Sequence, residues 1–435
     1  MIRELSAEQS SFITQNSGDA VCIVSSTGYI EYANPAMEKL FGIDSNSNIK
    51  LWDAIPFIAD NDDLIQLFLD AVYQKNDSHE AIVNYRDNED KLHNIHVRII
   101  CPNEDKLEVL VVITDLTQLL RLNKAFERYT SRDIAKYVLE TPDGHKRGGI
   151  NKEVSILMSD LRGFTSISTK LPPDELIVIL NHYFEKMSEI IEKNNGTIIE
   201  FLGDGIFVVF GAPSDLPDHA SLAVKCAIEM ENAMDEVNKW NIENGLPELE
   251  MGIGINSGLA IVGNIGSENK MKYGCMGATV NLTGRVEGLA VGGQIYITEN
   301  VQKLISEELI ISDETSILPK GASKLLRVLE IEGIGDLQLH NRFDKNLEWI
   351  DRTDDNEYPF FMLDGKTVDE EKFIGKLIRI TKDKKYSILS TKTVLDEKAN
   401  IMIKINNEYV YAKVMAEEED GYRIRFTSGN KEIIS

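Results

Sequence analysis

Apolar residues change their spacing several times along the chain, which predicts several successive domains. Residues 8–118 mix short strands with short helices: VCIVSSTGYIEYA predicts two strands around a Ser-Thr-Gly turn, and Asn34-Pro35 begins a short helix. NIHVRIICP and LEVLVVITDLT then alternate apolar and polar positions, as antiparallel strands with one buried face do. An α+β domain is expected here.

A helical segment follows at 119–149. Leu119, Leu122, Phe126 and Tyr129 are separated by 3, 4 and 3 residues, which is the spacing of one helix face. The spacing predicts a connector in which two copies of the chain pair as parallel helices. The alternative is an amphipathic helix docked on a neighbouring domain.

From 150 to 335 strands and longer helices alternate, which predicts an α/β domain. VSILMSD predicts a strand, TIIEFLGDGIFVVFG a hairpin of two apolar strands, and PPDELIVILNHYFEKMSEIIEK a helix that stops at Gly196. A second long helix, further strands and a third helix, ATVNLTGRVEGLA, come next.

The tail has a third pattern. Residues 358–435 contain five or six short strands separated by polar turns, such as GKLIRITKD, YSILST and GYRIRFTS, which predicts a small β-barrel. DRTDDNEYP at 351–359 is expected to be a linker.

Composition limits the classes of function. The 435 residues include 71 acidic and 46 basic side chains, giving a net charge of −25. Such a field repels phosphate backbones and anionic membrane surfaces, so neither nucleic acid nor a membrane is an expected partner. Four cysteines without C-x-x-C spacing argue against a disulfide scaffold and a Cys-rich zinc site. Because no apolar run reaches roughly 18 residues and the N-terminus lacks an apolar signal segment, a cytoplasmic protein is expected.

Two aspartates are placed where a metal could bind. Asp160 follows an apolar strand and Asp204 lies in the tight turn of an apolar hairpin. Carboxylates at two adjoining strand ends provide the oxygen ligands that Mg²⁺ prefers. The turn through Gly163, Phe164 and Thr165 exposes backbone N–H groups that could bind a phosphate. Either aspartate alone would more often be a turn residue or a helix cap.

Asn281 and Arg285 form a further candidate pair. They are four residues apart in ATVNLTGRVEG and therefore share one helix face. An arginine offers several donors to a phosphoryl group that gains charge, and an asparagine can orient a sugar. For an isolated pair, an exposed arginine beside a cap-like asparagine would be the simpler interpretation.

These motifs occur together and in a known order. SDLRGFTSIS, GTIIEFLGDGIFVVFGAP, MGIGINSGLAIVGNIGS and ATVNLTGRVEG resemble the class III nucleotidyl (guanylate/adenylate) cyclase catalytic domain over about 180 residues. FERYTSRDIAKYVLETP resembles the helical transducer element that precedes it, and 8–118 resembles a PAS sensor domain. The tail faintly resembles a PilZ-like barrel but lacks that family's arginine-rich entry motif, which favours a structural or interaction role for it.

The resemblance implies a ferredoxin-like α/β catalytic domain that works as a head-to-tail homodimer with active sites at the interface. Asp160, Asp204 and Leu161 match the metal-binding positions for two Mg²⁺ or Mn²⁺ ions per site. These ions would activate the ribose 3′-hydroxyl for in-line attack on the α-phosphorus, giving a 3′,5′-cyclic nucleotide and pyrophosphate. Asn281 and Arg285 match the pair that the opposite protomer contributes to orient the ribose and stabilise the transition state.

A phosphate-binding element is less well matched. Family members commonly have a Lys-Gly-Lys stretch late in the domain, whereas PKGASK supplies Lys320 and Lys324 with Ala322 between them. These two lysines are weak candidates for triphosphate binding.

Base selectivity in the family rests largely on two positions, which are Glu200 and Gly274 here. Guanylyl cyclases usually have Glu at the first, accepting from guanine N1–H and the 2-amino group, where adenylyl cyclases have Lys. A carboxylate facing adenine N1 would set acceptor against acceptor. Gly274 offers no side chain, and neighbouring Cys275 points to the other strand face. GTP is therefore the expected substrate, unless Glu200 is a strand-edge residue facing water.

The resemblance thus predicts a guanylate cyclase regulated by its PAS domain. An adenylate or dual-specificity cyclase acting on ATP is the nearest alternative. A catalytically silent nucleotide-binding module is a different class of function, but the full set of Asp160, Asp204, Asn281 and Arg285 argues against it. No residue pattern identifies the ligand of the PAS domain or the partner of the tail.

Overall fold

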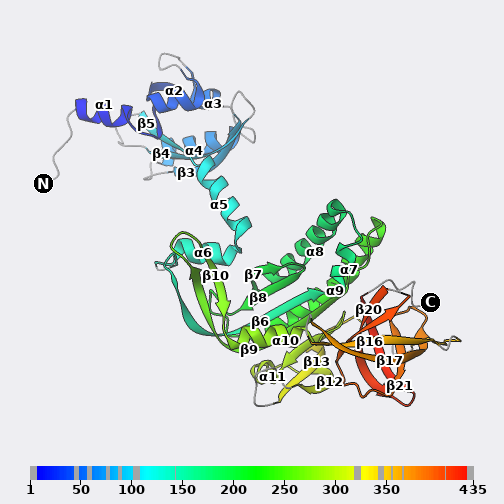
Figure 1. Cartoon of the computed structure of the whole chain (residues 1–435). Helices are drawn as coiled ribbons and strands as arrows, with labels where there is room; N and C mark the ends of the chain where they lie inside the picture. The colour runs from blue at the N-terminus through cyan, green and yellow to red at the C-terminus, as the bar shows by residue number, and fades with distance from the viewer. Residues whose placement is uncertain are drawn as a thin grey trace. The chain divides into compact units, whose positions relative to one another are not determined.

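A computed structural model gives the fold. It describes residues 7–43, 49–55, 61–74, 79–86, 91–100, 108–142, 144–317, 325–340, 347–353, 356–364, 367–406 and 408–428. The chain divides into two compact units, 1–129 and 130–435, which are described separately (Figure 1).

The first unit is built on a five-stranded antiparallel sheet of order β2-β1-β5-β4-β3. Alternate residues of β4 and β5, such as Ile95, Val97 and Val111, are buried in its core, which confirms the two expected strands with one buried face. Asn34 begins α2 by accepting from the Met37 N–H at 3.0 Å. The strands are β1 (Ala20–Ser25), β2 (Ile30–Ala33), β3 (His79–Arg86), β4 (Leu92–Ile100) and β5 (Glu108–Asp115); the helices are α1 (Ala7–Gln15), α2 (Pro35–Phe41), α3 (Leu51–Ala54), α4 (Asn61–Gln74) and α5 (Thr117–Tyr129).

Within one chain, the expected helical connector at 119–149 is divided into two helices, α5 and α6. α5 ends at Tyr129, and Ser131 begins α6 (Arg132–Glu140) by accepting from the Ile134 N–H. On α5, Leu119 is 61% exposed and Leu122 is 69% exposed. The pairing of two copies through this face stays a prediction. Asp143, at the expected end of the connector, lies outside the described residues.

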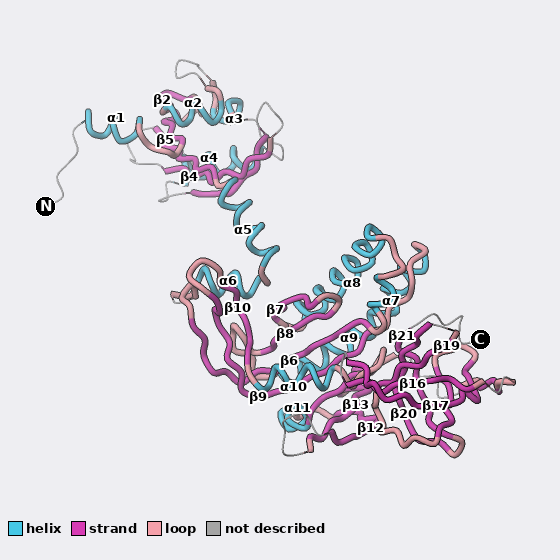
Figure 2. The backbone as a smooth tube through the Cα atoms, viewed as in Figure 1, coloured by secondary structure: helices cyan, strands magenta, loops and turns pink. Residues whose placement is uncertain are grey.

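Residues 148–338 form an α/β domain around a sheet of order β12-β13-β11-β9-β6-β8-β7, with β10 paired to β9. Figure 2 shows the two long central strands, β6 (Gly148–Leu161) and β9 (Met251–Gly266), running side by side. The remaining strands are β7 (Thr197–Leu202), β8 (Gly205–Phe210), β10 (Met271–Met276), β11 (Ile295–Thr298), β12 (Leu309–Ile317), β13 (Leu326–Ile334) and β14 (Leu337–Gln338).

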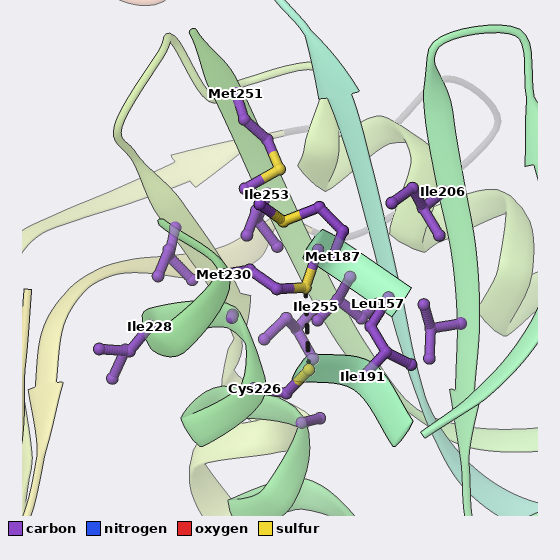
Figure 3. Packing of buried hydrophobic residues seen from close by; sticks show 14 of the residues in the cluster. Leu157, Met187, Ile191, Ile206, Cys226, Ile228, Met230, Met251, Ile253 and Ile255 are labelled. Atoms are coloured by element: carbon purple, nitrogen blue, oxygen red, sulfur yellow. Dashed lines mark hydrogen bonds between the residues drawn. The ribbon is translucent and has the colours of Figure 1, made fainter. Parts of the chain in front are cut away.

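Both faces of this sheet are covered, so its central strands are apolar on both sides. Leu157 belongs to the core under the long helices α8 (Pro173–Lys193) and α9 (His219–Glu243), which Figure 3 shows from close by. Its neighbour Ile156 belongs to the opposite core, together with Ile134 of α6. The other helices are α7 (Phe164–Ser168), α10 (Ala278–Glu287) and α11 (Glu299–Leu304).

The tail forms a closed barrel of six strands, as expected. The sheet runs β17-β16-β19-β20-β21-β18, and a further pairing of β17 with β18 closes it. The expected linker at 351–359 is instead partly strand, because Asp351 ends β15 and residues 357–359 begin β16. The strands are β15 (Trp349–Asp351), β16 (Glu357–Asp364), β17 (Thr367–Thr381), β18 (Tyr386–Thr391), β19 (Asn400–Ile405), β20 (Glu408–Glu418) and β21 (Gly421–Ser428).

Candidate active site

The structure brings Asp160 and Asp204 together. β6 pairs antiparallel with β8, so the end of β6 lies beside the β7–β8 turn that carries Asp204. The Leu161 N–H donates to Asp204 Oδ2 at 3.2 Å. A Cβ atom on Gly205 would lie 2.7 Å from the Ser159 carbonyl oxygen, so a glycine is needed for this close approach.

Negative charge accumulates at this point. Burial, the Glu287 carboxylate and Asp204 together raise the pKa of Asp160 to about 7, although Arg162 opposes the shift. A divalent cation would offset this repulsion, so the residues fit the metal that the sequence implies. Since the Leu161 side chain is buried, only its main-chain atoms could take part. The described residues include no group of three or more His, Cys, Asp or Glu placed to hold a metal, so a cation here would rely on two carboxylates and other oxygen ligands.

Arg162 is a site residue that the sequence reasoning missed. Its Nη1 lies 3.2 Å from Asp160 Oδ2, and its Nη2 donates to the Glu287 main-chain oxygen at 2.9 Å and to the Glu287 carboxylate. A Cβ on Gly252 would lie 2.5 Å from that Nη2, so the glycine makes room for the guanidinium. An arginine two residues after a metal-site aspartate was the available signal. Its carboxylate partner lies 125 positions away, beyond the reach of local patterns.

The candidate phosphate turn lies directly after Arg162. Gly163 adopts φ 70° and begins α7, while Phe164 is buried and Thr165 is exposed. The N–H groups of a first helical turn have no partner within their own helix, so they remain available to an anion. Lys320 and Lys324, the other phosphate candidates, lie outside the described residues.

Asn281 and Arg285 are both exposed on α10. Because each residue advances a helix by about 100°, Glu287 lies about 160° around the axis from Arg285. Glu287 contacts Arg162, beside Asp160, so Asn281 and Arg285 point away from that side. The helix is pressed against β9: a Cβ on Gly254 would lie 2.2 Å from the Glu287 nitrogen.

Glu200 lies at a β-bulge in β7 and its side chain is 45% exposed. The Lys272 ammonium of β10 donates to its carboxylate at 2.5 Å, a pairing that the sequence did not indicate. Gly274 lies two residues beyond Lys272 and so on the same strand face. Cys275 is buried, and this burial raises its pKa to about 11. Its side chain packs in the same core as that of Tyr273, on the strand face opposite Lys272. The role of Gly274 in base selection stays a prediction.

Comparison with known proteins identifies the family. Residues 149–329 match the adenylate and guanylate cyclase catalytic domain, and residues 18–118 match a PAS domain. Residues 149–329 are a class III nucleotidyl cyclase catalytic domain. The resemblance of the sequence to these two domains is thereby confirmed.

Proteins similar to this catalytic domain are named for both substrate classes. Adenylate cyclase 1 of Rhizobium meliloti is 30% identical over 211 residues, covering 48% of this chain and 32% of that protein. An adenylate cyclase of Anabaena cylindrica is 31% identical over 188 residues, covering 42% of this chain and 37% of that protein. The chain therefore spans only about a third of these curated relatives. The solved structure of the guanylyl cyclase Cya2 is 45% identical, with a TM-score of 0.44, and the match covers 45% of this chain and all of that one.

Membrane insertion through a helix finds no support in the part of the chain that the structure describes. None of its helices is both long enough and apolar enough to cross a bilayer.

Proposed function

We propose that this cyclase is a guanylyl cyclase that converts GTP to 3′,5′-cyclic GMP and pyrophosphate as a homodimer, under control of its PAS domain. The observation that carries the substrate assignment is the exposed Glu200 carboxylate, oriented by Lys272 on the neighbouring strand. An ionised carboxylate accepts two hydrogen bonds from guanine, at N1–H and the 2-amino group. Adenine presents an unprotonated N1 instead, so the same carboxylate would disfavour ATP.

The catalytic residues divide into two sets. Asp160 and Asp204, the metal half, would hold two Mg²⁺ or Mn²⁺ ions, which supply charge neutralisation and activation of the ribose 3′-hydroxyl when bound. Asn281 and Arg285, the α10 half, would orient the ribose and stabilise the charge that develops on the α-phosphoryl group. The Gly163–Thr165 turn would bind phosphate through its backbone N–H groups.

The direction of α10 supports a homodimer. Asn281 and Arg285 face away from Asp160 of their own chain and are exposed, so a second copy can receive them. Each active site would then combine the metal half of one chain with the α10 half of the other. Neither chain completes a site alone, which makes the dimer obligatory for activity.

Control by the PAS domain has a structural route within the second unit. The ring of Tyr137 on α6 packs edge-on against Tyr273, with 5.6 Å between ring centroids, and Tyr273 lies between Lys272 and Gly274. A rotation of α6 would therefore displace the strand that faces the base. Since misplacement by about 1 Å can cost about 10²-fold in rate, small helix movements suffice for regulation.

The test is a product assay. The purified chain is incubated with GTP or ATP and Mg²⁺ or Mn²⁺, and products are identified by mass spectrometry. We expect cyclic GMP, and we expect Glu200→Lys to lower kcat/KM for GTP at least about tenfold relative to ATP, whereas Glu243→Lys on an exposed part of α9 leaves the ratio unchanged. Mainly cyclic AMP from the wild type would support the second candidate, an adenylyl cyclase, as the names of the curated relatives suggest.

A further inference from the structure

The C-terminal barrel buries three cations against the catalytic domain. Lys398 is 9% exposed, Lys413 is 2% exposed and Arg425 is 5% exposed, and no other lysine or arginine among the described residues is as deeply buried. Each comes from the barrel, drawn in orange and red in Figure 1, and each bonds to the catalytic domain. A buried cation is costly unless it is paired, so its placement restricts the geometry of the contact.

Lys413, on β20, holds the end of α10. Its ammonium donates to the Gly288 carbonyl oxygen at 2.9 Å and to the Leu289 carbonyl oxygen. Gly288 caps the C-terminus of α10, where backbone carbonyls lack helical partners and carry partial negative charge. The hydrogen bonds from Lys413 satisfy these carbonyls and fix the axis of the helix that carries Asn281 and Arg285.

Arg425, on β21, reaches the metal half through Glu250. Arg425 Nη2 lies 3.0 Å from Glu250 Oε2, and Lys385 Nζ lies 3.2 Å from Glu250 Oε1. The main-chain oxygen of Glu250 accepts from the Arg162 N–H at 2.7 Å, and Arg162 pairs with Asp160. Two bonded steps therefore join the barrel to the turn that follows the first metal carboxylate.

The barrel is also fixed to the sheet. The Lys398 ammonium donates to Tyr296 Oη at 2.6 Å, and that hydroxyl donates to Glu330 Oε2 at 2.9 Å. Arg425 Nη1 donates to the Gly292 carbonyl oxygen at 2.6 Å, in the loop between α10 and β11. Through these hydrogen bonds the barrel contacts the segment from the end of α10 to β11 at Gly288, Gly292 and Tyr296.

We propose that the C-terminal barrel is a positioning element of the cyclase, in which Lys413 holds the α10 half and the Arg425–Glu250 pair holds the metal half. The inference rests on the proposed function, because the two halves on one chain then belong to two different active sites. One barrel accordingly influences both sites of the dimer, each through a separate contact.

Heterodimers of full-length chains separate these contacts. One chain carries Arg285→Ala and keeps its metal half; the other carries Asp204→Ala and keeps its α10 half. Two affinity tags isolate the mixed dimer, which has a single complete site. Lys413→Met is then placed on either chain, and cyclic nucleotide formation is measured with the triphosphate that the wild type uses.

On the chain that supplies α10, Lys413→Met is expected to lower kcat about tenfold or more with little change in KM, because Asn281 and Arg285 act in the transition state. On the other chain the same substitution is expected to change kcat less than about twofold, because its α10 half is already inactive. Lys413→Arg on the α10 chain should restore most activity by supplying hydrogen-bond donors to the same carbonyls. Lys404→Met is the control, since that barrel ammonium lies over the Tyr409 ring of the same barrel.

The outcomes distinguish a failure of the shared-site dimer from a failure of the barrel's positioning role. An inactive reference heterodimer would contradict the proposed shared-site dimer, and the positioning role with it. An active reference that loses activity equally with Lys413→Met on either chain would overturn the positioning role alone, because the barrel would then act on folding or assembly in general. The same conclusion would follow if Lys404→Met reproduced the effect.

Discussion

Replacing Asp160 by Asn should make the metal-free cyclase more stable at pH 8 while abolishing its stabilisation by metal. The folded-state pKa of Asp160 is raised from 3.8 to about 7 by burial and by the charges of Glu287 and Asp204. Between about pH 4 and pH 7 the folded chain therefore holds a proton that the unfolded chain releases. The contribution of Asp160 to stability falls as the pH rises through this window, and above pH 7 the full cost is present.

The magnitude follows from the shift and from the exposure of the carboxylate. A pKa rise from 3.8 to about 7 in a fully buried group would correspond to about 4 kcal/mol at pH 8. The Asp160 side chain is 41% exposed, so solvent screening reduces the expected gain to on the order of 1–2 kcal/mol. For a unit of this size, such a change raises the midpoint of thermal unfolding by a few degrees.

The assay is thermal unfolding of full-length wild type and Asp160→Asn at pH 5 and pH 8, with and without Mg²⁺ or Mn²⁺. Without metal, the variant should exceed the wild type at pH 8, and the difference should shrink at pH 5. A metal at ten times its Kd should stabilise only the wild type, by about 1.4 kcal/mol. Asp336→Asn, at an exposed turn, is the matched control. A metal-free variant less stable than the wild type at pH 8 would refute the electrostatic reasoning.

Two further predictions concern other parts of the catalytic unit. Burial, with the nearby charge of Arg162, lowers the pKa of Lys413 to about 7, so the unfolded chain retains a proton that the folded chain loses between about pH 7 and 10. Stability from this group should rise over that range, and denaturant titrations should find the rise absent in Lys413→Met. Gly254→Ala should cost about 1–3 kcal/mol and lower activity, because the new Cβ would lie 2.2 Å from the Glu287 nitrogen, whereas Gly284→Ala within α10 should leave stability equal or up to about 1 kcal/mol higher. A destabilisation by Gly284→Ala as large as that of Gly254→Ala would contradict the packing argument.

The parts of the fold and site that could be predicted from the sequence are those encoded by short local motifs. The β7–β8 hairpin, the strand ending near Asp160 and the helix with Asn281 and Arg285 are each encoded within about 20 neighbouring residues, through apolar alternation and turn residues. The six-stranded barrel was also predictable, because short strands separated by polar turns close on themselves to remove sheet edges.

Ion pairs between residues far apart in the sequence could not be predicted from local motifs. Arg162 pairs with Glu287, which is 125 residues away in the sequence. Lys272 pairs with Glu200 across 72 residues, and Arg425 pairs with Glu250 across 175. The two partners of each pair belong to distant parts of the chain, so only the order of strands in the sheet and the docking of the barrel bring them together. The break between α5 and α6 was different, because Ser131 supplied a local capping signal that the continuous helical spacing obscured.

Arg162 and Lys272 explain how so acidic a protein could bind a nucleoside triphosphate. With a net charge of −25, the chain repels a nucleoside triphosphate at long range. At the site, however, Arg162 faces Asp160 and Lys272 faces Glu200, so two of the three proposed functional carboxylates have a cation beside them. A metal that binds Asp160 would compete with Arg162, which keeps Glu287 as a second partner and need not be left unpaired. At Asp160 one positive charge can therefore replace another, so metal binding there leaves neither this carboxylate nor the Arg162 guanidinium without a partner of opposite charge.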